Sequence, residues 1–215
     1  MSLDVRQLTV GPLAENCFVF RAEGAESALV VDPGEEPERI LAEIEQTGAT
    51  VEAILITHCH FDHVGAVAAM ARHTGAPVYC PAGEVKILEN INDYVRFPGF
   101  GPFESYTPEK TVADGDKLTL AGFEIDVIGT PGHSIDHVTY SIPAEKAIFS
   151  GDVLFQGSVG RTDLPGSDHQ TLMDSIARLL ETLPDDTGVL PGHMDPTTLG
   201  TERAGNPFLR ELAHR

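Results

Sequence analysis

Metal-capable side chains gather in one short stretch of the chain. Three histidines and one aspartate fall within six positions, as His58, His60, Asp62 and His63. Imidazole nitrogen and carboxylate oxygen are common ligands of divalent transition metals. A single histidine is unremarkable in a fold, but four potential ligands at this density are not. The stretch therefore predicts a metal centre, in which hydrolysis by a metal-activated water is the natural chemistry.

The elements on either side of this stretch explain how its side chains could converge. Residues 53–56 are an unbroken apolar run, which predicts a buried strand. At strand spacing His58 and His60 point to the same side, and Cys59 points to the other. A helix is expected to begin near Asp62 and to end at Thr74-Gly75. The strand end thus supplies two imidazoles and the helix start supplies the carboxylate and the third imidazole, enough to bind one ion and begin a second site. Cys59 is expected to be a small core residue.

Three further metal-capable residues occupy the same sequence context elsewhere. Each follows an apolar strand and a Gly- or Pro-containing turn, and they are His133, Asp152 and His193. Strands that end in ligands can gather them at one rim of a packed sheet, and small residues let the backbone approach the ion. We therefore expect all seven residues at one rim.

Seven ligands exceed the four that one zinc ion takes. The first ion is assigned to His58, His60 and His133, the second to Asp62, His63 and His193, and Asp152 is expected to bridge the two. Two ions about 3.5–4 Å apart would share a hydroxide with a pKa near neutral. This hydroxide, held by Asp62 and Asp152 through the metals, is the predicted catalytic group.

Other polar residues have plainer interpretations. Asp32 ends an apolar strand before Pro33-Gly34, where it could form the turn or hold a ligand histidine in place. The remaining histidines are expected at the surface or in local hydrogen bonds, and of these His137 lies near enough in sequence to His133 to support a ligand; they are His73, His137, His169 and His214.

The rest of the chain predicts mixed α/β structure. Residues 5–32 predict an antiparallel meander, and helices are expected at 37–47 and 169–183, where Ser167 or Asp168 could cap the second. Further strands are expected at 77–80, 117–120, 123–128, 138–142, 147–150 and 188–190, with a loop at 157–166 and a helical tail. Residues 94–106 are aromatic and rich in Gly and Pro. They predict either a lid or pocket wall, or a surface loop packed by its own aromatics.

Length and charge limit the remaining possibilities. The 215 residues fit one domain over 1–215, or two small similar halves. The net charge of −19, without a basic run, argues against nucleic-acid binding. No signal peptide or membrane-length apolar run is found, and three cysteines without paired spacing favour the cytoplasm. We expect a monomer or homodimer that acts on a small molecule.

The motif His-x-His-x-Asp-His after an apolar strand resembles the metallo-β-lactamase superfamily. Motifs elsewhere in the chain resemble the glyoxalase II branch of this superfamily. The resemblance is greatest to the short, single-domain, hydroxyacylglutathione hydrolase-like proteins of bacteria. These motifs include Gly11-Pro12-Leu13, Asp32-Pro33-Gly34, Thr130-Pro131-Gly132-His133, Ser150-Gly151-Asp152, Gly160-Arg161-Thr162-Asp163 and Pro191-Gly192-His193. The resemblance implies a four-layer αββα sandwich. It also implies that Asp152 bridges the metals, because the antibiotic-cleaving branch lacks an aspartate there, and it favours Asp32 as the partner of a ligand histidine.

Two activities are compatible with this resemblance. The first is a dinuclear thioester hydrolase that uses two divalent ions, zinc before iron, on S-lactoylglutathione or a related acylthiol. The second is a mononuclear iron dioxygenase that acts on glutathione persulfide through His58, His133 and Asp152. The intact second ligand set favours the hydrolase.

Several positions depart from the family pattern. Ser134-Ile135-Asp136 replaces the usual Thr-Pro-Gly, and Met194 replaces the Gly that commonly follows the last ligand histidine. We expect the basic C-terminal glutathione-binding region of full-length glyoxalase II to be missing from this protein. Arg161 stands in the loop where that enzyme supplies a lysine to the substrate, so it could bind a substrate carboxylate or pair with Asp163.

Overall fold

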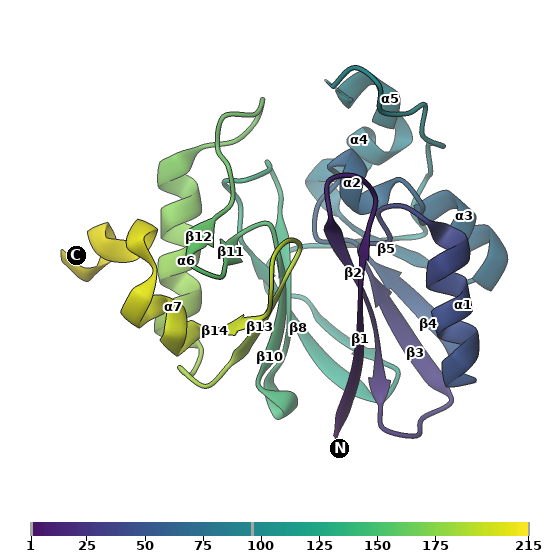
Figure 1. Ribbon diagram of the computed structural model, residues 1–215, viewed down its shortest axis with the longest axis horizontal. Coiled ribbons are helices and arrows are strands. Elements are labelled where there is room, and N and C mark those ends of the chain that lie inside the picture. The colour runs from purple at the N-terminus through teal and green to yellow at the C-terminus, as the bar shows by residue number, and fades with distance from the viewer. Residues whose placement is uncertain (1, 96, 215) are drawn as a thin grey trace. The chain divides into compact units, whose positions relative to one another are not determined.

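The computed structural model describes residues 2–95 and 97–214, and the chain divides into two compact units. Unit 1 comprises Met1–Val112 with Thr119–Phe123, and unit 2 comprises Ala113–Leu118 with Glu124–Arg215. Each unit is organised around one six-stranded sheet that carries helices (Figure 1). The expectation of a single domain over 1–215 stays a prediction. Among the described residues, no helix is both long and apolar enough to cross a membrane.

The sheet of unit 1 combines a meander with parallel strands. Its order is β1 (Leu3–Val10), β2 (Glu15–Ala22), β3 (Ser27–Val31), β4 (Thr50–Leu55), β5 (Val78–Pro81) and β6 (Lys110–Val112). The first three strands pair antiparallel, as predicted, and β3 to β6 pair in parallel. The β4 residues Ala53, Ile54 and Leu55 are fully buried, so the strand before the motif is a core strand.

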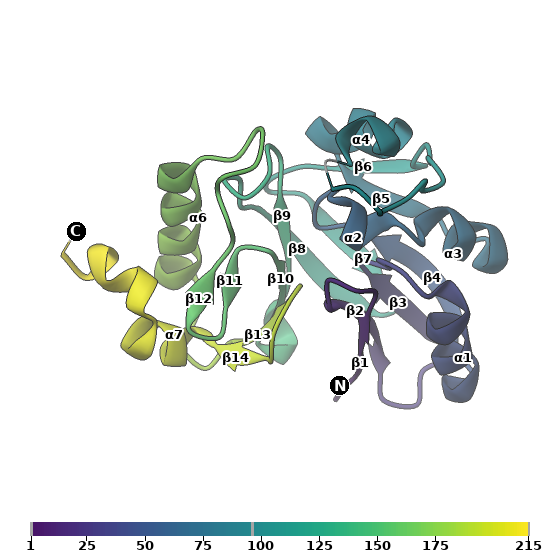
Figure 2. The ribbon, with the colours of Figure 1, turned by 45° about the horizontal axis from the view of Figure 1, so that its top comes forward.

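Helices α1 (Pro37–Thr47) and α3 (Val67–Thr74) pack on this sheet (Figure 2). The predicted bounds of α1 are confirmed, with Pro37 in the first turn and Gly48 in the left-handed conformation at the end. The predicted helix end at Thr74-Gly75 is confirmed, but a single helix from Asp62 to Thr74 is wrong. Helix α2 (Phe61–Val64) ends first, and the Ala66 N–H donates to the Pro33 carbonyl at 3.1 Å rather than continuing the helix.

The segment after β5 is partly helical. It contains η1 (Ala82–Glu84), α4 (Val85–Glu89) and α5 (Ile91–Tyr94). Between α5 and β6, the described residues 95 and 97–109 form no helix or strand. The irregular aromatic loop predicted at 94–106 is thus found, except that Tyr94 still belongs to α5.

Unit 2 carries most of the second sheet, of which Thr119, Leu120 and Phe123 are grouped with unit 1. Its order is β14 (Thr197–Thr198), β13 (Gly188–Pro191), β10 (Ala147–Gly151), β9 (Val138–Ile142), β8 (Phe123–Gly129) and β7 (Lys117–Leu120). Helix α6 (His169–Thr182) buries Leu172, Ile176 and Leu179 against the core of this unit, and Asp168 caps it by accepting the Thr171 N–H at 2.7 Å. The loop expected at 157–166 is partly wrong, because β11 (Leu154–Phe155) and β12 (Ser158–Val159) form a short hairpin. The predicted helical tail is α7 (Leu199–Gly205) and η3 (Pro207–His214), and Arg215 lies outside the described residues.

Candidate metal centre

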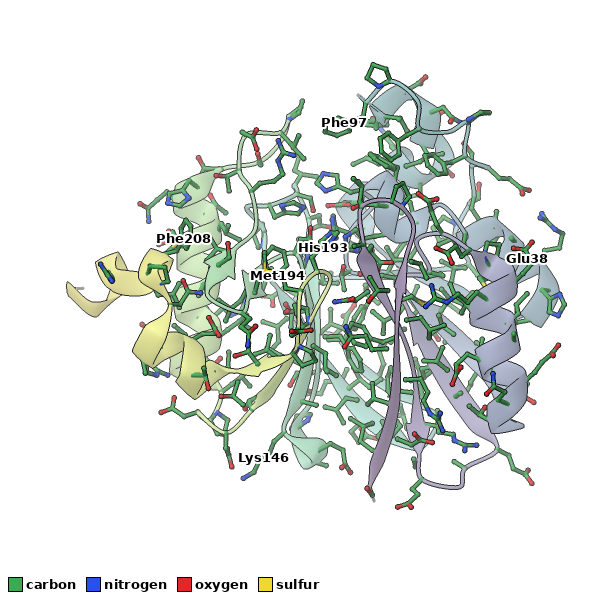
Figure 3. The ribbon with its side chains drawn as sticks, in the orientation of Figure 1. Glu38, Phe97, Lys146, His193, Met194 and Phe208 are labelled. Atoms are coloured by element: carbon green, nitrogen blue, oxygen red, sulfur yellow. The ribbon has the colours of Figure 1, made fainter. Side chains whose placement is uncertain are left out.

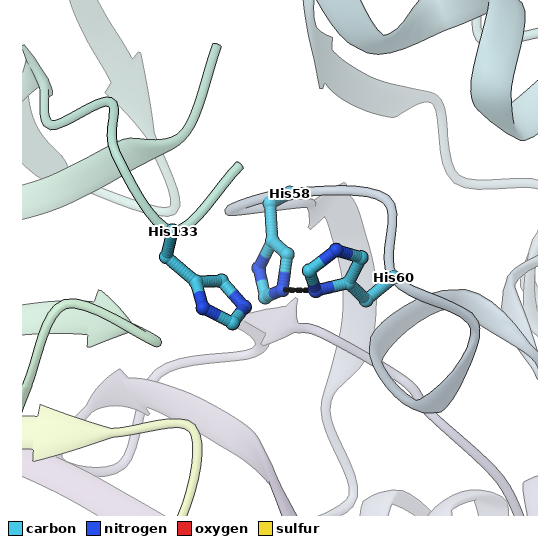
Figure 4. A group of neighbouring side chains, drawn as sticks. All are labelled: His58, His60 and His133. Atoms are coloured by element: carbon cyan, nitrogen blue, oxygen red, sulfur yellow. Dashed lines mark hydrogen bonds between the residues drawn. The ribbon is translucent and has the colours of Figure 1, made fainter. Parts of the chain in front are cut away.

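His58 and His60 lie just beyond the end of β4 and present donor atoms to each other. His58 Nε2 and His60 Nδ1 are 3.0 Å apart (Figure 4). His58 is fully buried, and the rings meet edge to face. Donor atoms around a tetrahedral zinc ion at about 2.0–2.1 Å are separated by roughly 3.3 Å. The spacing of this pair therefore suits two ligands of one ion.

Asp32 holds the histidine stretch in place through three hydrogen bonds. Its Oδ1 accepts the Thr57 N–H at 2.7 Å, and its Oδ2 accepts the Thr57 hydroxyl at 2.6 Å. Oδ2 also lies 3.0 Å from His63 Nδ1. Of the two interpretations of Asp32, the geometry agrees with the partner of a ligand histidine. Its role at a bound metal stays a proposal.

These contacts assign the protons on two rings. An ionised carboxylate only accepts, so the proton of neutral His63 sits on Nδ1 and its Nε2 carries the lone pair. The Thr57 hydroxyl donates to Asp32, so it accepts from His58 Nδ1, 3.1 Å away. His58 Nε2 is then also unprotonated. One carboxylate thus prepares two rings in the form that binds a metal.

Asp62 follows in helix α2, with its Oδ2 4.0 Å from His63 Nε2. The Asp62 backbone rests against Gly34, where a Cβ would lie only 1.7 Å from the Asp62 carbonyl oxygen. Glycine at 34 is therefore what lets the turn after β3 approach the ligand helix so closely. Unit 1 as a whole brings together His58, His60, Asp62 and His63.

Unit 2 brings together the other three predicted ligands. Asp152 Oδ2 lies 3.4 Å from His133 Nε2 and 3.5 Å from His193 Nε2. His133 and Asp152 are buried, and His193 is partly exposed. One carboxylate oxygen thus contacts two imidazoles that the sequence assigns to different ions. That all seven residues meet at one rim stays a prediction.

The loop after β12 supports His133 through its backbone. The Arg161 carbonyl accepts from His133 Nδ1 at 2.9 Å, which leaves Nε2 as the unprotonated nitrogen beside Asp152. The Arg161 guanidinium instead pairs with Asp163 through two 2.7 Å bonds. The hydrogen bonding from Arg161 is the main reason why the pKa of Asp163 is lowered. The ion pair agrees with one of the two interpretations of Arg161, and substrate binding by Arg161 stays a prediction.

Gly160 lets this loop approach the strand that carries Asp152. A Cβ at position 160 would lie 1.9 Å from the Asp152 carbonyl oxygen and 3.3 Å from His133 Cβ. No side chain fits there, so close packing explains why the Gly-Arg-Thr-Asp motif begins with glycine.

Sequence reasoning underestimated His137. It is fully buried, and its Nε2 accepts the Asp152 backbone N–H at 3.1 Å. Its proton is therefore on Nδ1, which is 3.0 Å from the Thr130 hydroxyl. Only the proximity of His137 to His133 in sequence hinted at this support. Glu84 was missed entirely: it is buried and accepts the Cys59 N–H between two predicted ligands.

In both units the donor set fits a divalent metal ion. Five of the predicted metal ligands have a nitrogen or oxygen atom 3.0–3.5 Å from that of another predicted ligand; they are His58, His60, His133, Asp152 and His193. In His58, His63 and His133 the Nδ1 atom contacts a protein group, which leaves Nε2 for a metal. Asp32, His58 and His63 also have donor atoms within 4.8 Å of one another. Because the Asp32 oxygens already accept hydrogen bonds, the contacts of Asp32 agree with a support for the histidines of this group, and that role stays a prediction.

The chain belongs to the metallo-beta-lactamase superfamily, whose family model matches residues 10–193. The expected α/β fold class, the αββα sandwich of this superfamily, is confirmed. The chain is a metallo-hydrolase of this superfamily.

Relatives cover nearly the whole chain. Hydroxyacylglutathione hydrolase GloC of Haemophilus influenzae is 34% identical over 209 residues, which are 96% of this chain and 98% of GloC. The crystal structure of BLEG-1 B3 metallo-beta-lactamase matches with a TM-score of 0.90 and 38% identity, covering 96% of this chain and 100% of that one. TTHA1623 in a di-iron-bound form matches with a TM-score of 0.85 and 42% identity, covering 95% and 100%. The resemblance stated from the motifs is thereby confirmed for the superfamily.

Position 194, where Met replaces the Gly of the family pattern, has a backbone conformation that favours glycine. It follows His193 on the turn after β13, has φ of 68° and is 52% exposed (Figure 3). Left-handed backbone strains any residue with a Cβ, so glycine is the unstrained choice at this position. We expect Met194→Gly to raise the free energy of unfolding by about 0.5–1 kcal/mol. Thermal unfolding of the metal-free protein measures this. Met194→Ala is the control, since it keeps the Cβ; an equal gain in both variants would contradict the backbone explanation.

Cys59 is buried, as predicted, and its Sγ lies 3.5 Å from Cys80 Sγ. Burial, followed by the Cys80 thiol, raises the pKa of Cys59, so the thiolate is scarce at neutral pH. We expect Cys59→Ala to keep kcat/KM within about threefold of the wild type and to lose about 1 kcal/mol of stability. We also expect iodoacetamide to leave the folded enzyme active. Inactivation that the Cys59→Ala variant escapes would show that the thiol has a role in activity.

Proposed function

We propose that this protein is a dinuclear metal-dependent thioesterase that acts on S-lactoylglutathione or a related acylthiol. The two ions would be held by His58, His60 and His133 and by Asp62, His63 and His193, with Asp152 shared. Zinc is the first choice of metal and iron the second. Near-complete coverage by GloC, whose name states hydroxyacylglutathione hydrolysis, supports the substrate class.

The observation that carries the proposal is the position of Asp152. Its Oδ2 is 3.4 Å from the ring of one proposed site and 3.5 Å from a ring of the other. A carboxylate between two imidazoles of different sites is what a bridging ligand requires. A mononuclear site built on His58, His133 and Asp152 would have no use for the His193 contact.

The protein's own groups would act by orienting the side chains that bind the metals. Asp32 and Thr57 hold His58 and His63, the Arg161 carbonyl holds His133, and His137 fixes the Asp152 backbone. When bound, divalent ions would supply Lewis acidity, lowering the pKa of water and polarising the thioester carbonyl. No separate general base is then required.

Metal analysis of protein purified without added metal, combined with thioester assays, tests the proposal. We expect two ions per chain and hydrolysis of S-lactoylglutathione or simpler thioesters. If every thioester is inert with two zinc ions bound, while the iron-loaded protein consumes oxygen with glutathione persulfide, the dioxygenase alternative replaces the hydrolase. Nitrocefin serves as a third substrate, because cleavage of it in preference to thioesters would favour the antibiotic-cleaving activity that the name of BLEG-1 states.

A further inference from the structure

The aromatic loop of unit 1 is anchored at one end and packs over the ligand helix. Asn92 binds the Phe103 N–H and carbonyl, both at 2.8 Å, and Arg72 pairs with Glu104. The Phe61 ring, between His60 and Asp62 in sequence, lies 5.0 Å from Phe100 and stacks on Phe103 at 5.5 Å. Of the two interpretations of this loop, its contacts make it a wall beside predicted metal ligands.

A groove of about 470 Å³ opens along this wall. It runs between the β1–β2 turn and the loop, and its described lining residues are Pro12, Glu35, Gly99, Phe100, Gly101, Pro102 and Phe103. Two aromatic rings thus face the groove together with one ionisable side chain, Glu35.

The surroundings of Glu35 are acidic. Its carboxyl carbon would lie 2.9 Å from a Cβ at Gly11, so the side chain lies flat against the β1–β2 turn. Burial, followed by Asp62 and Glu36, raises its pKa. Glu36 differs, since it accepts the Gly11 N–H at 2.9 Å and pairs with Arg39 at 3.1 Å. Among the described residues, no hydrogen bond or ion pair to the Glu35 carboxylate is found.

We infer that this groove binds the thiol-carrier half of the substrate, and that Glu35 with Phe100 and Phe103 receives a cationic nitrogen of that carrier. The inference rests on the proposed function. A carboxylate beside aromatic faces attracts an ammonium group by charge and by cation–π interaction, and it repels a carboxylate placed at the same position. The groove lies next to Phe61, so a carrier there would leave its thioester close to His60 and Asp62.

A charged substrate and its uncharged isostere test whether the groove prefers a cationic carrier. Acetylthiocholine carries a quaternary ammonium, and S-(3,3-dimethylbutyl) thioacetate has the same shape without charge. For the metal-loaded enzyme we expect kcat/KM to be about tenfold higher for acetylthiocholine. This ratio should fall to near one in Glu35→Gln and decrease in Phe100→Leu. Glu38→Gln, which neutralises an exposed carboxylate on α1, is the matched control and should keep the wild-type ratio. A ratio near one in the wild type, or one unchanged by Glu35→Gln, overturns the inference.

Direct binding separates this inference from the proposed function. The inert thioether 2-(methylthio)ethyl-trimethylammonium and its neutral carbon isostere can be titrated calorimetrically into the metal-loaded protein. We expect about tenfold tighter binding of the cation, abolished by Glu35→Gln. If all thioesters are inert yet this preference holds, the thioesterase proposal fails and the groove assignment stands. If thioesters are cleaved and no preference for the cation is measured, the thioesterase proposal stands and the groove assignment fails.

Discussion

Asp152→Ala should abolish tight binding of both metals and lower kcat/KM for thioesters by at least about 10³-fold. The physical reason is that one buried carboxylate oxygen contacts both His133 and His193. Removing it takes a ligand from two ions at once, whereas His133→Ala or His193→Ala takes one ligand from one ion. Metal content after dialysis and steady-state kinetics measure the effect.

The control for Asp152→Ala is Asp195→Ala, which removes an exposed carboxylate two residues after His193. It should keep both metals and full activity. Two tightly bound metals in Asp152→Ala would rule out the bridging role, and a loss no larger than that of His133→Ala would rule out a shared ligand.

Asp32→Ala should lower metal affinity by about 10–100-fold and reduce the free energy of unfolding by roughly 2–4 kcal/mol. The Asp32 carboxylate is buried and accepts from Thr57 twice and from His63 Nδ1. Without it the Thr57 N–H is buried with no acceptor, and His63 loses the partner that sets its tautomer. The Thr57 hydroxyl beside His58 also loses the acceptor that orients it. Metal titration and urea unfolding of the metal-free protein separate the two effects.

Asp32→Asn is the informative comparison. Its amide oxygen can still accept from Thr57, but its NH₂ group cannot accept from His63 Nδ1. Stability should recover in part while metal affinity stays low. Asp93→Ala, at an exposed aspartate of the same unit, should change neither quantity. Wild-type metal affinity in Asp32→Asn would show that Asp32 only forms the turn.

The sequence alone determined the local elements and the identity of the candidate ligands. The period of apolar residues and the Pro37 and Gly48 signals determine α1 to the residue, since they act within one turn of helix. The unbroken run 53–56 likewise determines a core strand. The ligand types were visible because His, Asp and Gly/Pro turns recur at strand ends, a pattern that needs no knowledge of packing.

The tertiary structure decided what surrounds each ligand. The contacts of Asp32 with Thr57 and His63, of Arg161 with His133 and of His137 with Asp152 join residues up to 31 positions apart. The break between α2 and α3 has the same origin, because the Pro33 carbonyl takes the Ala66 N–H. Hydrogen bonds between segments depend on how strands are ordered in a sheet, and local propensity carries no information about that order. For the same reason the sequence identified the metal-capable residues of this protein, and only the folded chain revealed which buried groups prepare them to bind.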